Sequence, residues 1–350
     1  STVAYVLAMI LYNFYLAFRN NQIGVIATTF TITGFLSQTL AIATRWKEFY
    51  DLGQMGFLRA APLTNLYESL IFFIWCLILV YLVIEFKYRN RSFGAFITPI
   101  AVLALAYIDI SGMSRNIQPL VPALQSNWLL AHVMMSFIAY ALFAISFSTG
   151  LMCLILRTEK RNEAAYIFWT LMLSVFVITL AAMGLDFLKF KLVVTGQEEL
   201  IQNYLFKASF RSGSAMVSAL SWTVSVAITF LIWRFGHSLK KIMEGFHISA
   251  EALDDLTYRC IATGFPVFTL GGLIFGAIWA DQAWGKYWTW DPKETWSLIT
   301  WFIYAFYLHS RLIKGWKGKK AAMVAVFGFL AVIFTYLGVN LLLSGLHSYG

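Results

Sequence analysis

Ten long apolar runs make up most of this 350-residue chain and constrain its fold more than any other feature. A helix needs about 20 apolar residues to cross the hydrocarbon core of a bilayer. The runs have this length and are continuous rather than alternating, which argues against a β-barrel. The sequence therefore predicts an all-α, polytopic transmembrane bundle with spans at 2–18, 22–44, 66–86, 93–110, 128–156, 164–186, 213–234, 259–280, 296–313 and 321–343.

The composition also indicates a membrane protein. The chain is 60% hydrophobic and 12% charged, with a mean hydropathy of +0.71. A soluble domain carries roughly twice this share of charged residues. The three cysteines, Cys76, Cys153 and Cys260, stand singly in or beside apolar runs, so the sequence indicates neither a zinc site nor a redox pair.

The net charge of +9 is a feature of the loops and does not indicate nucleic-acid binding. Basic residues lie in short connectors between apolar runs, and the two alternating sets of connectors carry unequal numbers of them. Because cytoplasmic loops are enriched in Lys and Arg, the richer set is expected to be cytoplasmic. That set contains Arg19, Lys87, Arg89, Arg91, Arg157, Lys160, Arg161, Arg234, Lys240, Lys241, Arg259, Arg311, Lys314, Lys317, Lys319 and Lys320.

Three connectors have the length or pattern of structured segments. Residues 45–65 are expected to form an amphipathic surface helix on the outer side, and residues 187–212 a longer outer segment. Residues 236–257 carry alternating basic and acidic residues and are expected to form a cytoplasmic amphipathic helix.

Residues 279–296 contain five tryptophans in a single connector on the outer side. An interfacial aromatic belt would spread over many helix ends, so this concentration predicts a binding surface for a large, flat, apolar ligand with a polar edge. Gly285 would give the loop a tight bend or let the ligand approach the backbone. The tryptophans are Trp279, Trp284, Trp288, Trp290 and Trp296.

Acidic residues near this loop have two readings. Asp291, followed by Pro292 and Glu294, fits a capped helix start that requires no chemistry, although a catalytic role stays open. A second stretch, from Arg59 to Glu68, contains Asn65 and also fits a capped helix. In this stretch, Arg59 is either an interfacial arginine or a partner for a ligand carboxylate.

The histidines fall at different depths. His132 and His347 lie at outer ends of spans, on the same side as the tryptophans, where two imidazoles suit axial ligation of haem iron. His309 lies about 20 Å along its helix from Trp296 and is therefore inside the lipid layer, where an ionisable residue is a functional candidate. The alternative for each is an ordinary hydrogen bond to a neighbouring helix. His237 and His247 lie in a basic connector and are interpreted as solvated or facing lipid headgroups, with a role in haem entry as the alternative.

The loop and its surroundings resemble the CcsA family, the haem-handling subunit of the System II cytochrome c synthase. The resemblance covers residues 62–70 with Trp75, residues 119–132, the block 279–309 that contains the WWD loop, and residues 338–347. It implies an external haem b between His132 and His347, and a second haem within the membrane that takes one ligand from His309. It assigns Trp284, Trp288, Trp290, Asp291 and Trp296 to the catalytic loop, and Trp279 and Gly285 to haem contact.

The resemblance also implies partners and a location. A CcsB-type membrane subunit would supply the second intramembrane ligand, and apocytochrome c would be the substrate, with a thioredoxin-like thiol reductant as an optional further partner. The chain would lie in lipid in the bacterial cytoplasmic membrane, or in the thylakoid membrane of a plastid, with its site facing the periplasm or lumen. Residues 1–126 would form an N-terminal transmembrane region and residues 127–350 the haem-handling core.

The implied reaction is the addition of two cysteine thiols of a C-x-x-C-H motif to the haem vinyl groups, catalysed chiefly by positioning. Two alternatives stay open at this point. One is a haem exporter or chaperone that serves a separate ligase. The other is a cytochrome b-like electron carrier, which would not need an exposed tryptophan loop.

Overall fold

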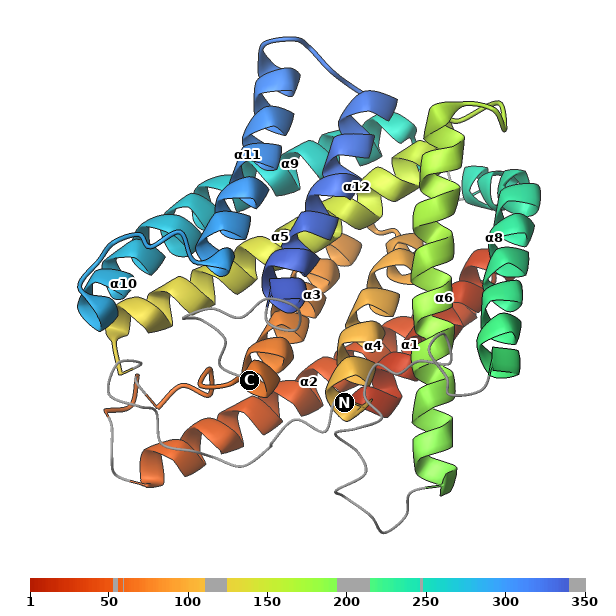
Figure 1. The fold of residues 1–350 in the computed structure, drawn as a ribbon. Coiled ribbons are helices and arrows are strands. Elements are labelled where there is room, and N and C mark those ends of the chain that lie inside the picture. Colours follow the sequence, from red (N-terminus) through yellow and green to blue (C-terminus); the bar gives the residue numbers. More distant parts are fainter. Residues whose placement is uncertain (53–55, 59, 111–124, 194–214, 246–247, 340–350) are drawn as a thin grey trace.

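The computed structural model describes residues 1–52, 56–58, 60–110, 125–193, 215–245 and 248–339 (Figure 1). All regular secondary structure in these residues is helical, which confirms the predicted all-α bundle. The α-helices are α1 (Thr2–Phe18), α2 (Asn21–Asp51), α3 (Leu66–Tyr88), α4 (Gly94–Ile110), α5 (Asn127–Arg157), α6 (Ala164–Val193), α8 (Ala215–Glu244), α9 (Ala250–Phe268), α10 (Gly276–Trp284), α11 (Pro292–Leu312) and α12 (Lys319–Ile333). Two π-helices, Thr269–Phe275 and Phe334–Gly338, continue α9 and α12.

The described part of every predicted span is helical, apart from Ile313 at the end of α11. Within the described residues, eight helical segments have the length and hydropathy needed to cross a membrane. Helix α1 is apolar but shorter, and α11 is not among the eight. Polar residues such as His309 and Arg311 lower the mean hydropathy of α11, so hydropathy alone does not identify it as a span.

Two predicted surface helices are wrong as separate elements. Helix α2 continues to Asp51, so the first part of the 45–65 connector extends a spanning helix, and turns follow it. The 236–257 connector is divided between the end of α8 and the start of α9. Helices α2 and α8 both continue past their apolar runs because the hydrogen bonds of a helical backbone do not need a hydrocarbon environment. The 187–212 segment lies largely outside the described residues.

Helix α5 is the central element of the bundle. It packs against α3, α9 and α12, and it crosses the middle of the molecule in Figure 1. From Ser136 to Ile155 nearly every side chain of α5 is buried. Helices α6 and α8 pair with each other at one edge, and the side chains of α8 are mostly exposed there. The centre of α5 is therefore fixed by protein contacts, while its N-terminal turns reach one end of the bundle.

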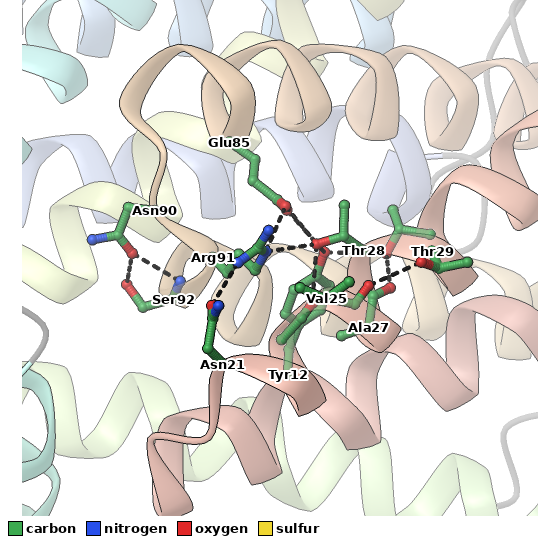
Figure 2. A network of polar contacts seen from close by, with 12 residues as sticks. Tyr12, Asn21, Val25, Ala27, Thr28, Thr29, Glu85, Asn90, Arg91 and Ser92 are labelled. Atoms are coloured by element: carbon green, nitrogen blue, oxygen red, sulfur yellow. Dashed lines mark hydrogen bonds and ion pairs between the residues drawn. The ribbon is translucent and has the colours of Figure 1, made fainter.

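A buried polar network holds the N-terminal helices together (Figure 2). Glu85 of α3 accepts hydrogen bonds from the hydroxyls of Tyr12, at 2.8 Å, and Thr28, at 2.5 Å, and from Tyr81. Arg91 lies 3.6 Å from the same carboxylate and also donates to Asn21. A buried carboxylate is tolerated when its lone pairs are occupied in this way. The network fixes α1 and α2 against α3.

Ion pairs join the helices at the end of the bundle opposite the tryptophan loop. Arg311 of α11 binds Asp254 of α9 at 2.6 Å, and Lys319 of α12 binds Glu163 at 2.5 Å in the connector between α5 and α6. The hydrogen bond from Lys319 and those from backbone amides lower the pKa of Glu163 to about 2. These contacts anchor one end of α9, α11 and α12, and the candidate site lies at the other end.

Candidate functional site

A cavity of about 180 Å³ lies where α5, the Thr269–Phe275 π-helix and the start of α11 meet. The start of α3 and the end of α12 complete its wall. It brings together segments that are far apart in the sequence, as expected for a ligand site between the helices of a bundle. Its lining includes Asn65, Ser69, His132, Ser136, Tyr140, Trp279, Tyr287, Trp288, Lys293, Glu294 and Tyr336.

His132 is held in one tautomer by its contact with the π-helix. Its Nδ1 lies 2.8 Å from the carbonyl oxygen of Gly271. A carbonyl oxygen only accepts, so Nδ1 carries the proton and Nε2 carries the ring lone pair. The indole of Trp279 stacks on the imidazole, with 6.3 Å between ring centroids and 19° between planes. This is the arrangement that orients a histidine for metal ligation, with a backbone carbonyl on the other nitrogen.

Two glycines, one in the π-helix and one at the start of α10, allow these segments to lie close to α5. A Cβ at Gly276 would lie 2.9 Å from His132 Nδ1, and a Cβ at Gly271 would lie 2.3 Å from the Cβ of Met135. Only glycine allows the two backbones this close approach. Single π-helical turns inside α-helices occur frequently at functional sites.

The five tryptophans do not form one continuous surface. Trp279 is only 3% exposed and contacts Trp284 edge-on at 4.8 Å, while Trp288 lines the cavity. Trp290 is 69% exposed and meets Trp288 edge-on at 5.8 Å. Trp296 packs on Phe334 at 4.2 Å, against the continuation of α12. The structure thus stacks Trp279 on His132 and places Trp288 in the wall of the same cavity, whereas Trp290 and Trp296 lie elsewhere.

The backbone conformation of the loop explains why its tryptophans lie in different places. Gly285 has a φ of 71° and ends α10 in a left-handed bend, as its predicted role in a tight turn requires. Trp290 also has a left-handed φ of 59°, which is rare for a bulky residue. The predicted capping box is confirmed, because Asp291 accepts from Lys293 N and Glu294 accepts from Asp291 N. The two acidic residues therefore begin α11.

The predicted capped start of α3 is also confirmed. Asn65 accepts a hydrogen bond from Glu68 N at 2.9 Å. The carboxylate of Glu68 is bound by Arg45 at 2.6 Å and by Thr64. Arg45 is thus a cation beside the cavity wall that the sequence did not single out, whereas Arg59 lies outside the described residues.

The remaining histidines occupy different settings. His309 is exposed on a face of α11 that also presents Phe302, Phe306 and Ile313. These positions are spaced by four, three and four residues, so they form one stripe directed away from the bundle. The ring of His237 meets Tyr166 edge-on at 5.1 Å, so it is packed rather than solvated. His347 and His247 lie outside the described residues.

Several residues of the cavity were missed in the sequence. Ser136 lies one helical turn after His132, and this spacing was the only signal for it. Gly271 and Gly276 are five residues apart in an apolar run that contains other glycines, so their role was not visible in the sequence. Among the described residues, no group of three or more His, Cys, Asp or Glu is arranged for a metal ion.

The fold and the site define a class of protein, namely polytopic helical membrane proteins with a histidine and tryptophan cavity at one end of the bundle. Residues 63–347 match the cytochrome C assembly protein family, and the chain belongs to that family.

The sequence is also similar to proteins named cytochrome c biogenesis protein CcsA. It is 36% identical to the one from Gloeobacter violaceus over 93% of this chain and 86% of that protein. It is 37% identical to the one from Pyropia yezoensis, over 98% and 93%, and 39% identical to the one from Microcystis aeruginosa, over 83% and 79%. The resemblance to the CcsA family is confirmed, and the chain is a multi-pass membrane protein of cytochrome c biogenesis.

Proposed function

We propose that this chain binds haem b in the cavity at His132 and presents it on the outer face of the membrane for covalent attachment to apocytochrome c. The observation that carries the proposal is the bond from His132 Nδ1 to Gly271 O, because it directs the Nε2 lone pair to ligation. The cavity is smaller than the roughly 300–1,000 Å³ of ordinary ligand pockets. It would therefore receive part of the macrocycle, and His347, which lies outside the described residues, is the second ligand in this proposal.

The position of His309 supports a second haem shared with another subunit. A histidine exposed to lipid is unfavourable unless it finds a partner. A CcsB-type subunit packed on the Phe302–Ile313 stripe would cover His309 and supply the other axial ligand. Haem would then pass from this position to the cavity at His132, in the periplasm or lumen.

The protein would contribute to the reaction mainly by positioning the haem vinyl groups and the cysteine thiols. Each thioether forms when a cysteine thiol of the C-x-x-C-H motif adds across a haem vinyl group, so no atom leaves and no external oxidant is consumed. The indoles of Trp279, which stacks on His132, and of Trp288, which lines the cavity, would hold the ring plane, and Asp291 would keep the loop in place through the start of α11. Trp284, Trp290 and Trp296 would support or extend this surface. Orientation of this kind can supply most of the rate enhancement.

A reconstituted assay tests the proposal. The complete complex is purified with its membrane partner and supplied with haem, a thiol reductant and apocytochrome c, and haem that stays on the cytochrome after denaturation is measured. We expect covalent haem without any further protein. If haem moves to the outer side but is attached only after a separate ligase is added, the chain is an exporter. If the chain binds haem but neither transfers nor attaches it, it is an electron carrier.

A further inference from the structure

His309 lies in the last turn of α11, close to the end of the helix at Leu312. The end turns of a helix are its least stable part, because some of their backbone groups lack partners within the helix. Leu312 and Ile313 are 65% and 73% exposed, so their side chains do little to hold this turn against the bundle. A histidine in such a turn keeps a fixed position only if other contacts hold the turn.

Asp254 of α9 supplies such a contact. Its Oδ2 lies 2.6 Å from Nη1 of Arg311, and the side chains of the aspartate and the arginine are only 7% and 10% exposed. Its Oδ1 accepts a hydrogen bond from the backbone N–H of Gly318 at 2.9 Å, directly before α12 begins. One buried carboxylate therefore binds the end of α11 with one oxygen and the start of α12 with the other.

The connector between α11 and α12 folds back on the same turn. The N–H of Trp316 donates to the carbonyl oxygen of Ser310 at 3.0 Å, and the carbonyl oxygen of Trp316 accepts from Nη1 of Arg311 at 3.2 Å. The guanidinium also lies over the ring of Tyr258 of α9, 5.3 Å from its centroid. The two residues that follow His309 are thus tied to α9 and to the connector.

The position of Arg311 also determines where His309 points. Each residue of an α-helix turns the chain by about 100°, so side chains two positions apart lie about 200° apart, on opposite sides of the helix. The guanidinium is drawn inward to Asp254, and the imidazole is therefore directed outward, where His309 is exposed. The buried ion pair and the outward histidine are two consequences of one helix orientation.

We propose that Asp254 is a positioning residue for the intramembrane haem. It acts through Arg311 by holding the last turn of α11, and it thereby keeps His309 at a fixed place on the outward stripe. The inference rests on the proposed function, in which His309 is an axial ligand of that haem. A ligand that is already held in place loses less conformational freedom on binding, so the haem is bound more tightly.

The test measures haem binding by the complete complex in a His132→Ala background, so that only the intramembrane haem contributes. The absorbance spectrum on titration with haem reports both the affinity and the number of axial ligands. Asp254→Asn is expected to weaken haem binding by roughly tenfold, as for other residues that orient a metal ligand. Its spectrum is expected to shift toward haem with one axial ligand.

A second variant tests the same contact with the charge kept. Arg311→Lys retains a cation opposite Asp254 but replaces the planar guanidinium by a flexible ammonium. It is expected to change the affinity and the spectrum in the same direction as Asp254→Asn, by a smaller factor. If Asp254→Asn does not accumulate, Arg311→Lys decides the question.

Two controls separate positioning from a general loss of stability. Asp255→Asn changes the next residue of α9, whose carboxylate binds Arg259 of the same helix at 2.6 Å. Glu85→Gln weakens the buried network that joins α1 and α2 to α3, and it is expected to lower the unfolding temperature of the complex. Both controls are expected to bind haem with the parent affinity and spectrum.

The outcomes distinguish the inference from the proposed function. Parent-like haem affinity and spectrum in folded Asp254→Asn or Arg311→Lys would overturn the inference. An equal loss of haem in Glu85→Gln, at the same fall in unfolding temperature, would also overturn it and assign Asp254 a role in stability alone. If the His132→Ala complex binds no haem that His309→Ala removes, the proposed intramembrane haem itself fails.

Discussion

Gly276 and His132 lie so close that a Cβ on the glycine would be 2.9 Å from the Nδ1 of the imidazole. Gly276→Ala should therefore push the ring off the Gly271 carbonyl and away from its ligating position. A displacement of about 1 Å can cost roughly 10²-fold in rate. We expect a loss of this order in covalent attachment, with a shifted haem absorbance band, and partial rescue by free imidazole.

Gly150→Ala is the matched control for this substitution. Gly150 is a helical glycine of α5, and an added Cβ there would meet α12 at 3.4 Å or more, which is ordinary contact. It should leave both the spectrum and the attachment rate unchanged. Normal attachment by Gly276→Ala would show that the position of His132 does not limit the reaction.

His132 and His347 are predicted to act as a pair on the external haem. Single substitutions by Ala should each abolish covalent attachment and leave the haem near His309 in place. The double variant should be little worse than either single variant, as for residues that act as a unit. A single variant that attaches haem at the parent rate would reduce that histidine to an ordinary interfacial residue.

His309→Ala is expected to remove the intramembrane haem from the purified complex. His309 lies on the outward stripe of α11, so the substitution leaves the buried core of the bundle intact. The protein should accumulate to its usual level, which a blot of the membrane fraction measures. Unchanged haem absorbance in this variant would refute the ligand role, and Phe306→Ala on the same stripe tests whether loss of partner contact alone removes haem.

The predicted orientation can be tested by labelling. All three native cysteines are buried, so they should react little with a membrane-impermeant thiol reagent. Cysteine placed at Lys286, in the tryptophan loop, should be labelled in intact cells. Cysteine placed at Lys317, in the connector between α11 and α12, should be labelled only after the cytoplasm is opened. The reverse pattern would put the cavity on the side away from secreted cytochromes.

The ion pair of Glu163 and Lys319 should contribute to stability in a pH-dependent way. The folded-state pKa of Glu163 is about 2, below the usual 4.5. Its contribution is therefore present above about pH 4.5 and is lost as the pH falls toward 2. Both groups are partly exposed, so we expect less than about 1 kcal/mol. Thermal unfolding in detergent at several pH values measures this. At acid pH the unfolding temperature of Glu163→Gln should fall slightly less steeply with pH than that of the parent protein.

The helices could be predicted from the sequence because hydropathy reports directly on the lipid environment. Hydropathy did not predict where α2 and α8 end, at Asp51 and Glu244. Both helices continue from an apolar into a polar sequence, and a polar sequence does not show by its hydropathy that it is helical. The Glu85 network was equally invisible. Its partners come from three separate helices, and only packing brings Tyr12 and Thr28 to one carboxylate.

The candidate site was predictable in composition but not in geometry. The concentration of tryptophans identified the loop, and His132 was found from its position at the end of a span. Which indoles meet the imidazole depends on backbone conformation, namely the left-handed Trp290 and the π-helix before Trp279. Neither conformation follows from residue type, because tryptophan rarely adopts a positive φ and π-helices have no simple sequence pattern.

The π-helix between α9 and α10 changes the direction in which the side chains of α10 point, relative to those of α9. Each residue of an α-helix turns the chain by about 100°, so a wider turn changes the direction of every side chain beyond it. The face that α9 presents to α5 includes Thr257, whose hydroxyl bonds Thr149, and Gly264, whereas α10 directs Trp279 at His132. Winding residues 269–275 as a regular α-helix, with no residue removed, would turn Trp279 about 100° away from the imidazole. In this way, one extra residue of backbone lets both α9 and α10, which follow one another in a single long helical segment, direct the required side chains toward α5.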